Sequence, residues 1–256
     1  MLSAIIPAAG KGTRLKPLTD YIPKELLILK DKPIIGYILD ALSYCGIKDV
    51  CVIVGHKKGE IIDYIKDGSE FNVDVCYVYQ KDPLGLGHAV MLGKRYIKNK
   101  YFMVFLGDTV IIPFDSVKNM IEKFKKNYEN IDGIIMVEKV NNPERFGVVK
   151  FNKEFVIEDV YEKPQEEEIK KKFEIGGNFY AISGVYIFHE NIFDYIKRTP
   201  PGKNNEIQLT DAIKSAIEDG KKFLAHIQTG IRLDIGTYES YLEAQKKILE
   251  WCKEYE

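Results

Sequence analysis

The fold is decided near the start of the chain by residues 2–15, LSAIIPAAGKGTRL. The first six of these residues form an apolar run, which is typical of a strand covered on both faces. The segment that follows has two glycines and two alanines, so its backbone N–H groups can approach an anion closely. Lys11 and Arg14 add positive charge, and Lys24 follows further on. We interpret the segment as a triphosphate cradle; the alternative interpretation is a tight surface turn.

This cradle differs from two common phosphate-binding motifs. The dinucleotide-binding fingerprint requires a third glycine where Leu15 stands, and an acidic residue where Gly55 and His56 stand. The P-loop requires Gly-Lys-Ser/Thr after four intervening residues, and Gly10-Lys11-Gly12 does not supply it. Both motifs are therefore excluded.

Apolar runs alternate with amphipathic segments in the first half of the chain. The patterns predict strands at 2–7, 50–54, 73–79 and 101–106, and helices at 33–46, 57–66 and 87–98. Alternation at this spacing favours βαβ units and a largely parallel sheet. Ligands of such sheets bind beyond the carboxyl ends of the strands, so functional residues are expected directly after the apolar runs.

The pattern changes after about residue 130. Strand-like runs follow one another at 133–137, 147–151, 155–161 and 180–188, and helices are expected at 165–172, 190–197, 207–218 and 238–253. We predict a single α/β domain over residues 1–256, a Rossmann-like three-layer α/β/α fold with a mixed, mostly parallel central sheet. Residues 1–130 form its first half, and residues 131–256 add an antiparallel part.

The composition narrows the class of protein. Thirty-seven Lys and Arg residues against 38 Asp and Glu residues give a formal net charge of −1, which excludes the basic excess of a dedicated nucleic-acid binder. No uncharged apolar run reaches the ~18 residues of a membrane span. The four cysteines are scattered without a CxxC pair, which is typical of reduced thiols in the cytoplasm. We therefore expect a cytoplasmic globular protein that binds neither nucleic acid nor membranes.

Residues 8–14, AAGKGTR, followed by Pro17-Leu18-Thr19 and Pro23-Lys24, resemble the signature of the sugar-phosphate nucleotidylyltransferases. Within this family the chain is most similar to the bacterial-type UTP–glucose-1-phosphate uridylyltransferases. That narrower resemblance rests on residues 22–26 (IPKEL), 83–90 (PLGLGHAV), 199–202 (TPPG) and 206–213 (EIQLTDAI). It implies a nucleotidyltransferase fold with a nucleotide-binding half and a sugar-binding half, and assembly as a homodimer or homotetramer.

The resemblance implies a nucleotide site in the first half. Gln80 would hydrogen-bond the pyrimidine edge, because an amide can both donate and accept, and the turn at Gly85 would let the base lie flat. Without the resemblance, Gln80 is an ordinary strand end and Gly85 a turn glycine. The implied nucleotide-binding residues are Ala8, Ala9, Gly10, Lys11, Gly12, Thr13, Gln80 and Gly85.

A metal site is indicated by two aspartates. Asp108 follows the apolar run 101–106, and Asp234 lies in RLDIG, residues 232–236. Mg²⁺ favours one or two carboxylates together with phosphate oxygens and waters. Each aspartate alone would be interpreted as a helix N-cap or turn residue, but the resemblance implies that the two together bind Mg²⁺ as cofactor.

The resemblance also implies the sugar-phosphate site. Glu162 would accept hydrogen bonds from sugar hydroxyls, and Lys163 would neutralise the sugar phosphate. The implied sugar-phosphate residues are Gly107, Gly147, Glu162, Lys163 and Gly184, and the implied catalytic residues are Arg14, Lys24, Asp108 and Lys163.

The implied reaction is UTP plus α-D-glucose 1-phosphate giving UDP-glucose plus pyrophosphate, by direct in-line attack of the sugar phosphate on the α-phosphorus. Two alternatives stay open: a dTTP-dependent glucose-1-phosphate thymidylyltransferase, and a non-catalytic homologue that binds a sugar nucleotide and regulates a partner. Thr19-Asp20-Tyr21 departs from the uridylyltransferase pattern, so the use of both UTP and dTTP is expected.

Overall fold

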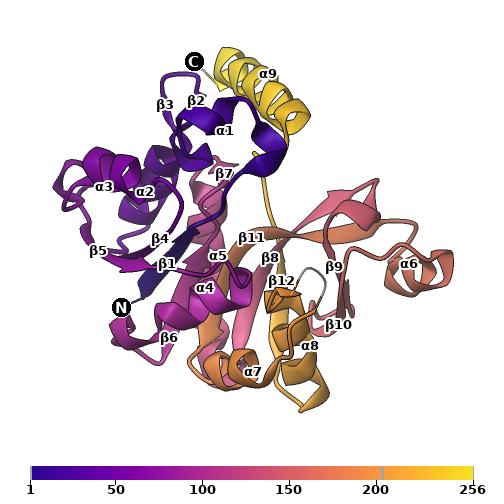
Figure 1. Cartoon of the computed structure of the whole chain (residues 1–256). Coiled ribbons are helices and arrows are strands. Elements are labelled where there is room, and N and C mark those ends of the chain that lie inside the picture. The colour runs from indigo at the N-terminus through magenta and orange to yellow at the C-terminus, as the bar shows by residue number, and fades with distance from the viewer. Residues whose placement is uncertain (1, 203–204, 256) are drawn as a thin grey trace.

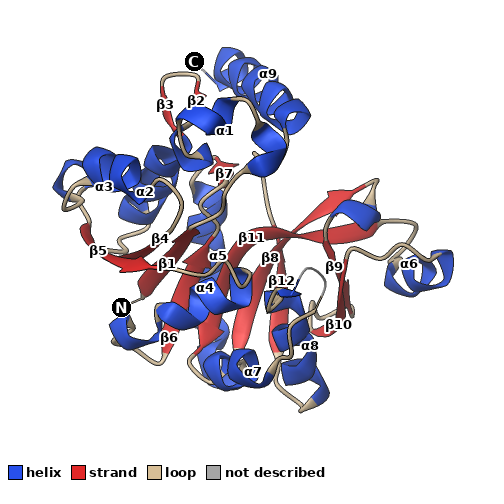
Figure 2. Ribbon diagram, viewed as in Figure 1, coloured by secondary structure: helices blue, strands red, loops and turns tan. Residues whose placement is uncertain are grey.

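The computed structural model describes residues 2–202 and 205–255, and its centre is a mixed β-sheet with helices on both faces (Figures 1 and 2). Within these residues the sheet has nine strands: β1 Ser3–Ala8, β4 Asp49–Val54, β5 Asp74–Tyr79, β6 Tyr101–Phe105, β8 Gly133–Val140, β9 Gly147–Phe151, β10 Ile157–Glu162, β11 Phe179–His189 and β12 Phe223–Ile227. Two small ribbons accompany it: β2 Ile28–Leu29 with β3 Lys32–Pro33, and β7 Thr109–Ile112 with β13 Ile231–Asp234. The helices are α1 Leu18–Tyr21, α2 Ile34–Tyr44, α3 Lys58–Ile65, α4 Leu86–Leu92, α5 Asp115–Asn127, α6 Glu167–Phe173, α7 Ile192–Arg198, α8 Leu209–Glu218 and α9 Tyr238–Tyr255.

Parallel pairing builds the first half of the sheet. Strand β1 lies between β4 and β6 and is parallel to both, and β5 continues the parallel order beyond β4. Ile5 and Ile6 point to opposite faces of β1, and both are fully buried. The apolar run therefore lacks polar alternation because helices cover both faces. The carboxyl ends of β1, β4, β5 and β6 meet at one edge of the sheet.

Strand β11 joins this half to the antiparallel half. Its residues Val185–His189 pair with β6, and β8 pairs along its other side. A bulge between Ile182 and Tyr186 contains Gly184, whose φ is +87°. Strands β9 and β10 form an antiparallel pair beyond it, and β12 pairs in parallel with β8. The sheet is therefore continuous across the two halves of the sequence.

The two faces of the sheet carry separate apolar cores. Helices α2, α3, α5 and α9 contribute buried residues to one core, and α4, α7 and α8 to the other. Figure 1 shows α7 and α8 beside each other below the sheet, and α9 beside the β2–β3 ribbon at the opposite end. The predicted three-layer α/β/α fold with a mixed sheet is confirmed.

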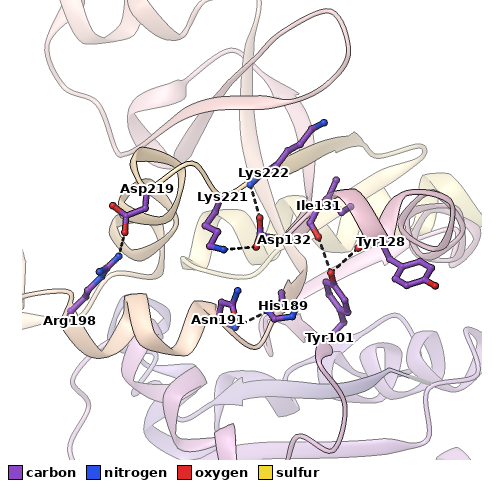
Figure 3. Close-up of polar contacts among 10 residues, drawn as sticks. All are labelled: Tyr101, Tyr128, Ile131, Asp132, His189, Asn191, Arg198, Asp219, Lys221 and Lys222. Atoms are coloured by element: carbon purple, nitrogen blue, oxygen red, sulfur yellow. Dashed lines mark hydrogen bonds and ion pairs between the residues drawn. The ribbon is translucent and has the colours of Figure 1, made fainter.

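Asp132 connects three strands at one edge of the sheet, where β8 and β12 begin and β11 ends (Figure 3). Its carboxylate accepts a hydrogen bond from the backbone N–H of Lys222 at 2.9 Å and pairs with Lys221 at 3.3 Å. Its backbone carbonyl accepts from His189 N at 2.7 Å. Close by, the hydroxyl of Tyr101 lies 2.8 and 3.0 Å from the backbone carbonyls of Tyr128 and Ile131, between which its one hydrogen is shared. These contacts lie at the edge opposite the strand ends at which ligands are expected.

Seven of the helices and strands named above were not predicted from the pattern: α1, β2, β3, α5, β7, β12 and β13. Helix α5 is charged over much of its surface but buries Val117, Met120 and Phe124 against the sheet. The spacing of those residues is helical. Strands β7 and β13 are short and pair only with each other in the described chain, so no long apolar run marks them.

Two predicted boundaries were wrong. The helix expected over 87–98 ends at Leu92, and a short 3-10 helix follows at Lys94–Tyr96. Gly93 between them packs against β1, where a Cβ would be 2.6 Å from Ile5 Cδ1. The strand expected over 155–161 begins at Ile157, because Phe155 has φ +62° in a turn held by the side chain of Asn152.

No helix in the described part of the chain combines the length and the apolar character needed to cross a membrane.

Candidate active site

A cavity of about 270 Å³ opens beyond the strand ends, between the two halves of the chain. Six of the predicted site residues line it: Arg14, Asp108, Gly147, Glu162, Lys163 and Asp234. They come from segments up to about 220 residues apart in the sequence. One cavity therefore contains positive and negative side chains from the predicted triphosphate, metal and sugar subsites. Such a convergence of charged groups fits a pair of anionic substrates better than an apolar ligand.

The loop after β1 has exposed side chains, and its turn is stabilised by a contact with Thr19. Gly12 has φ +62°, and a Cβ there would lie 2.8 Å from Thr19 Cγ2. The hydroxyl of Thr19 donates to Gly12 O at 2.8 Å, which fixes the turn. Lys11 and Arg14 are exposed on the loop. The loop therefore presents bare backbone and positive charge to the solvent side, as a phosphate cradle requires.

Lys24 lies beside this loop and reaches the first aspartate. A Cβ on Gly10 would be 3.5 Å from Lys24 Nζ, and the ammonium forms an ion pair with Asp108. Burial lowers the pKa of Lys24, but the surrounding carboxylates, Asp108 foremost, outweigh it and leave the pKa raised. Lys24 is therefore a fixed positive charge between the loop and the metal-site carboxylate.

The β7–β13 ribbon brings the two aspartates together. Asp108 directly precedes β7, and Asp234 ends β13 opposite Thr109. The backbone N–H of Ile235 donates to Asp108 O at 3.0 Å, which fixes the spacing of the two aspartates. Burial raises the pKa of the Asp234 carboxyl, and the negative charge of Asp108 raises it further. The positive charge of Arg232 lowers this pKa but does not cancel the increase.

This donor set fits Mg²⁺. Two carboxylates that repel one another are stabilised by a divalent cation bound to both, and magnesium takes its remaining ligands from phosphate and water. In residues 2–202 and 205–255, no group of three or more His, Cys, Asp or Glu side chains is arranged to hold a metal. Substrate oxygens and waters would therefore complete the coordination.

The sugar end of the cavity is built around Glu162. Its Oε1 pairs with Lys163 Nζ at 3.0 Å, and its Oε2 accepts a hydrogen bond from Thr210 Oγ1 at 2.8 Å. A Cβ on Gly147 would lie 3.1 Å from Glu162 Oε2, so the glycine keeps the carboxylate accessible. The carboxylate has a fixed orientation suited to accepting hydrogen bonds from hydroxyl groups.

Two predicted glycines support this end without lining the cavity. Gly107 N donates to Pro7 O at 3.1 Å, and a Cβ there would be 2.6 Å from the same oxygen. Gly184, in the β11 bulge, would place a Cβ 3.0 Å from Thr109 Oγ1. Both glycines allow close packing of the strands that carry Asp108.

The predicted base residues lie at the ends of the neighbouring strands, outside this cavity. Gln80 follows β5 and is buried, and its backbone N–H donates to Val54 O at 2.8 Å. Its amide nitrogen lies 2.9 Å from His88 Nδ1 and 3.4 Å from Gly85 O. Ala8 and Ala9 are buried at the end of β1.

The cavity residues that the sequence did not assign to a site include Arg145, Arg232 and Thr210. Arg232 pairs with Glu138 at 2.5 Å, and its guanidinium lies 4.7 Å from the centroid of the Phe146 ring. Arg232 stands two residues before Asp234 on one strand, and such residues share a face. That spacing is a signal which could have identified it.

Glu25 is a buried acid next to Lys24 that the predicted site does not use. Its side chain is fully buried, and among the described residues neither carboxyl oxygen has a hydrogen-bond partner. Burial raises its pKa to about 7 against the lowering effect of Lys24. Folding near neutral pH therefore favours the protonated form.

This burial predicts a pH-dependent stability. Between the ordinary pKa of a glutamate, about 4.3, and a folded pKa of about 7, the folded state binds more protons than the unfolded state, so stability falls as pH rises. Glu25→Gln is expected to reduce the loss of unfolding free energy between pH 5 and pH 8 by on the order of 2 kcal/mol. Urea denaturation at both pH values measures it, with the exposed Glu60→Gln as control. An unchanged pH dependence in Glu25→Gln would contradict the prediction.

Comparisons with known proteins agree with this geometry. A model of the nucleotidyl transferase family matches residues 3–250. The chain is 32% identical, over 97% of its length, to the low-salt glycan biosynthesis nucleotidyltransferase Agl11 of Haloferax volcanii, and covers 66% of that protein. It is 30% identical, over 97% of its length, to a glucose-1-phosphate thymidylyltransferase of Streptomyces antibioticus, and covers 67% of it. The chain thus spans about two thirds of the length of these curated relatives.

A solved structure is similar over the whole described fold. A UDP-glucose pyrophosphorylase in complex with UDP-glucose matches with a TM-score of 0.85 and 33% identity, covering 98% of this chain and 99% of that one.

Proposed function

The chain belongs to the nucleotidyl transferase family, and on that premise we propose that it transfers a uridylyl group from UTP to α-D-glucose 1-phosphate, giving UDP-glucose and pyrophosphate. One observation carries the proposal: a single cavity contains Arg14, the Asp108–Asp234 pair and the Glu162–Lys163 pair. These are the groups needed to hold a triphosphate, a divalent cation and a sugar phosphate next to one another.

The reaction needs positioning and charge balance more than a covalent nucleophile. An ionised oxygen of the sugar phosphate forms a bond to the α-phosphorus, the bond to the β-phosphate oxygen breaks, and pyrophosphate leaves. Two anions must be aligned against their repulsion, so electrostatic stabilisation is the main task of the site. Mg²⁺ bound by Asp108 and Asp234 would supply charge neutralisation to the phosphates.

Each side chain has a defined task in this proposal. Arg14 binds the triphosphate and stabilises the charge that develops on pyrophosphate. Lys24, held beside Gly10, balances charge near the attacked phosphorus. Lys163 holds the sugar phosphate, and Glu162 accepts hydrogen bonds from the sugar hydroxyls.

A thymidylyltransferase is the second candidate, because a relative at 30% identity bears that name. Uracil and thymine present the same hydrogen-bonding edge and differ by one methyl group, which is worth only about 1–3 kcal/mol. Measurable use of dTTP beside UTP is therefore part of the proposal. The non-catalytic alternative is disfavoured because Arg14, Lys24, Asp108, Lys163 and Asp234 are all present.

Pyrophosphate release tests the proposal directly. UTP, dTTP, CTP, ATP and GTP are each mixed with Mg²⁺ and glucose, galactose or N-acetylglucosamine 1-phosphate, and specificity constants are measured. The highest value is expected for UTP with glucose 1-phosphate. A preference for a purine nucleotide, or no pyrophosphate from any combination, would refute it.

Thr210→Val is expected to raise KM for glucose 1-phosphate about five- to tenfold, with a smaller effect on kcat. The variant keeps the side-chain shape but removes the hydrogen bond that orients Glu162, a loss of about 1 kcal/mol or slightly more. Thr199→Val is the matched control, because Thr199 is also buried and donates to a backbone carbonyl away from the cavity. Equal effects of both variants on KM would contradict the assigned role.

A further inference from the structure

The contacts of the Gln80 amide fix which of its two ends faces outward. The amide nitrogen lies 3.4 Å from Gly85 O and 2.9 Å from His88 Nδ1. A backbone carbonyl can only accept a hydrogen bond, so the NH₂ group and not the oxygen must be on this side. His88 Nδ1 then accepts the second amide hydrogen, which places the proton of the neutral imidazole on Nε2.

This arrangement changes what Gln80 can offer to a ligand. Both amide hydrogens are directed to protein acceptors, and Oε1 accepts no hydrogen bond from the described residues. Gln80 therefore presents an acceptor, whereas the sequence alone predicted a group that both donates and accepts.

We infer that His88 is a positioning residue that holds Gln80 in the acceptor orientation and thereby selects bases with a protonated N3. The inference rests on the proposed function and on the contact with the pyrimidine edge that the family resemblance implies for Gln80. Uracil and thymine offer N3–H to such an oxygen. Cytosine has an unprotonated N3, so the two acceptors would repel one another. Its 4-amino group reaches the oxygen only if the base shifts sideways, which leaves N3 unpaired.

The chain around His88 is rigid enough to enforce this orientation. Gly87 N donates to Ile207 O at 2.9 Å, and Ile207 N donates to Leu84 O at 2.8 Å, so the start of α4 is held on both sides. Gly85, at φ +97°, packs so closely that a Cβ there would lie 2.8 Å from Ile207 N. The backbone that carries His88 is therefore held in place beside the Gln80 amide, and the acceptor-only carbonyl of Gly85 disfavours the turned-over amide.

Two isosteric variants separate this role from simple packing. Asparagine at position 88 retains an acceptor near the position of Nδ1, whereas leucine has the same shape without one. Specificity constants for UTP, dTTP and CTP are measured with glucose 1-phosphate. The ratio of UTP to CTP is expected to stay within a few-fold of the wild-type value in His88→Asn and to fall about tenfold or more in His88→Leu, because leucine cannot accept the hydrogen bond that orients the amide.

Internal controls make the outcome specific. The UTP-to-dTTP ratio and KM for glucose 1-phosphate are expected to stay within about twofold in both variants, since neither depends on N3. An unchanged UTP-to-CTP ratio in His88→Leu, or equal losses in the leucine and asparagine variants, would overturn the inference while leaving the proposed function intact. A wild-type enzyme that uses neither UTP nor dTTP would overturn both.

A measurement on the wild-type protein covers the case in which His88→Leu does not fold. ¹⁵N NMR of histidine-labelled protein, with the His88 signals assigned by their loss in His88→Asn, reports which ring nitrogen carries the proton. An unprotonated Nδ1 and a protonated Nε2 are expected. A proton on Nδ1 would overturn the inference, because the imidazole could then not accept from Gln80.

Discussion

Asp108→Asn and Asp234→Asn are each expected to lower kcat by at least about 10²-fold while leaving the fold intact. Asparagine keeps the shape of the side chain but removes a negative charge from the predicted metal site. Removing one electrostatic group from a reaction centre costs on the order of 3–4 kcal/mol of transition-state stabilisation, and a metal ligand belongs to this class. Turnover at saturating Mg²⁺ measures the effect, with circular dichroism and Tm as folding controls.

The two variants also distinguish metal binding from another effect. Asp108 forms an ion pair with Lys24, so its loss also frees that lysine. Asp234 is held by the pairing of β13 with β7 and faces the charges of Arg232 and Arg14, so its variant tests the metal role without breaking the Lys24–Asp108 ion pair. The exposed Asp63→Asn on α3 is the matched control and should leave turnover unchanged. More than about a tenth of the wild-type rate in Asp234→Asn would refute its role as a ligand.

Arg14→Ala is expected to lower kcat about 10²-fold with a much smaller change in KM for glucose 1-phosphate. The guanidinium lies beside Gly236 and the Asp234 carboxylate, since a Cβ on Gly236 would be 3.5 Å from both Arg14 Nη2 and Asp234 Oδ2. From there it can stabilise charge that shifts toward pyrophosphate, an interaction that strengthens in the transition state. The side chain is exposed, so its loss should not destabilise the fold.

Lys163→Ala provides the contrast, because it is expected chiefly to raise KM for glucose 1-phosphate. Steady-state kinetics with each substrate varied in turn separates the two signatures. If Arg14→Ala changed only KM for the sugar phosphate and Lys163→Ala only kcat, the two phosphate subsites would have been assigned in reverse.

The parallel half of the fold could be predicted from the sequence because its inner strands β1, β4 and β6 are buried on both faces. That burial produces continuous apolar runs, and the residues directly after them, such as Asp108 and Gln80, are found at the expected edge. Helix α5 was not predicted because most of its residues are polar or charged, and only a narrow apolar stripe faces the core. The strands of the β7–β13 ribbon were missed because their pairing depends on two segments far apart in the chain.

The candidate residues that meet in the cavity could be named from the sequence where a local motif marks them, and not where their importance depends on a distant partner. Arg14, Glu162 and Asp234 do line one cavity. Thr210 matters only through its contact with Glu162, and nothing in its local sequence marks that contact. The acceptor orientation of Gln80 likewise depends on His88 and Gly85, which the sequence places nearby without showing which way the amide turns.

The position of β11 in the sheet has a consequence for synthesis of the chain on the ribosome. Strand β6 is complete at Phe105, but its second neighbour is β11, which starts only at Phe179. A nascent chain that has emerged through β6 therefore carries an unpaired apolar edge, the kind of surface that templates aggregation. The pairing of β6 with β11 can be completed only after His189 has left the ribosomal exit tunnel, so the sheet is expected to stay incomplete until then.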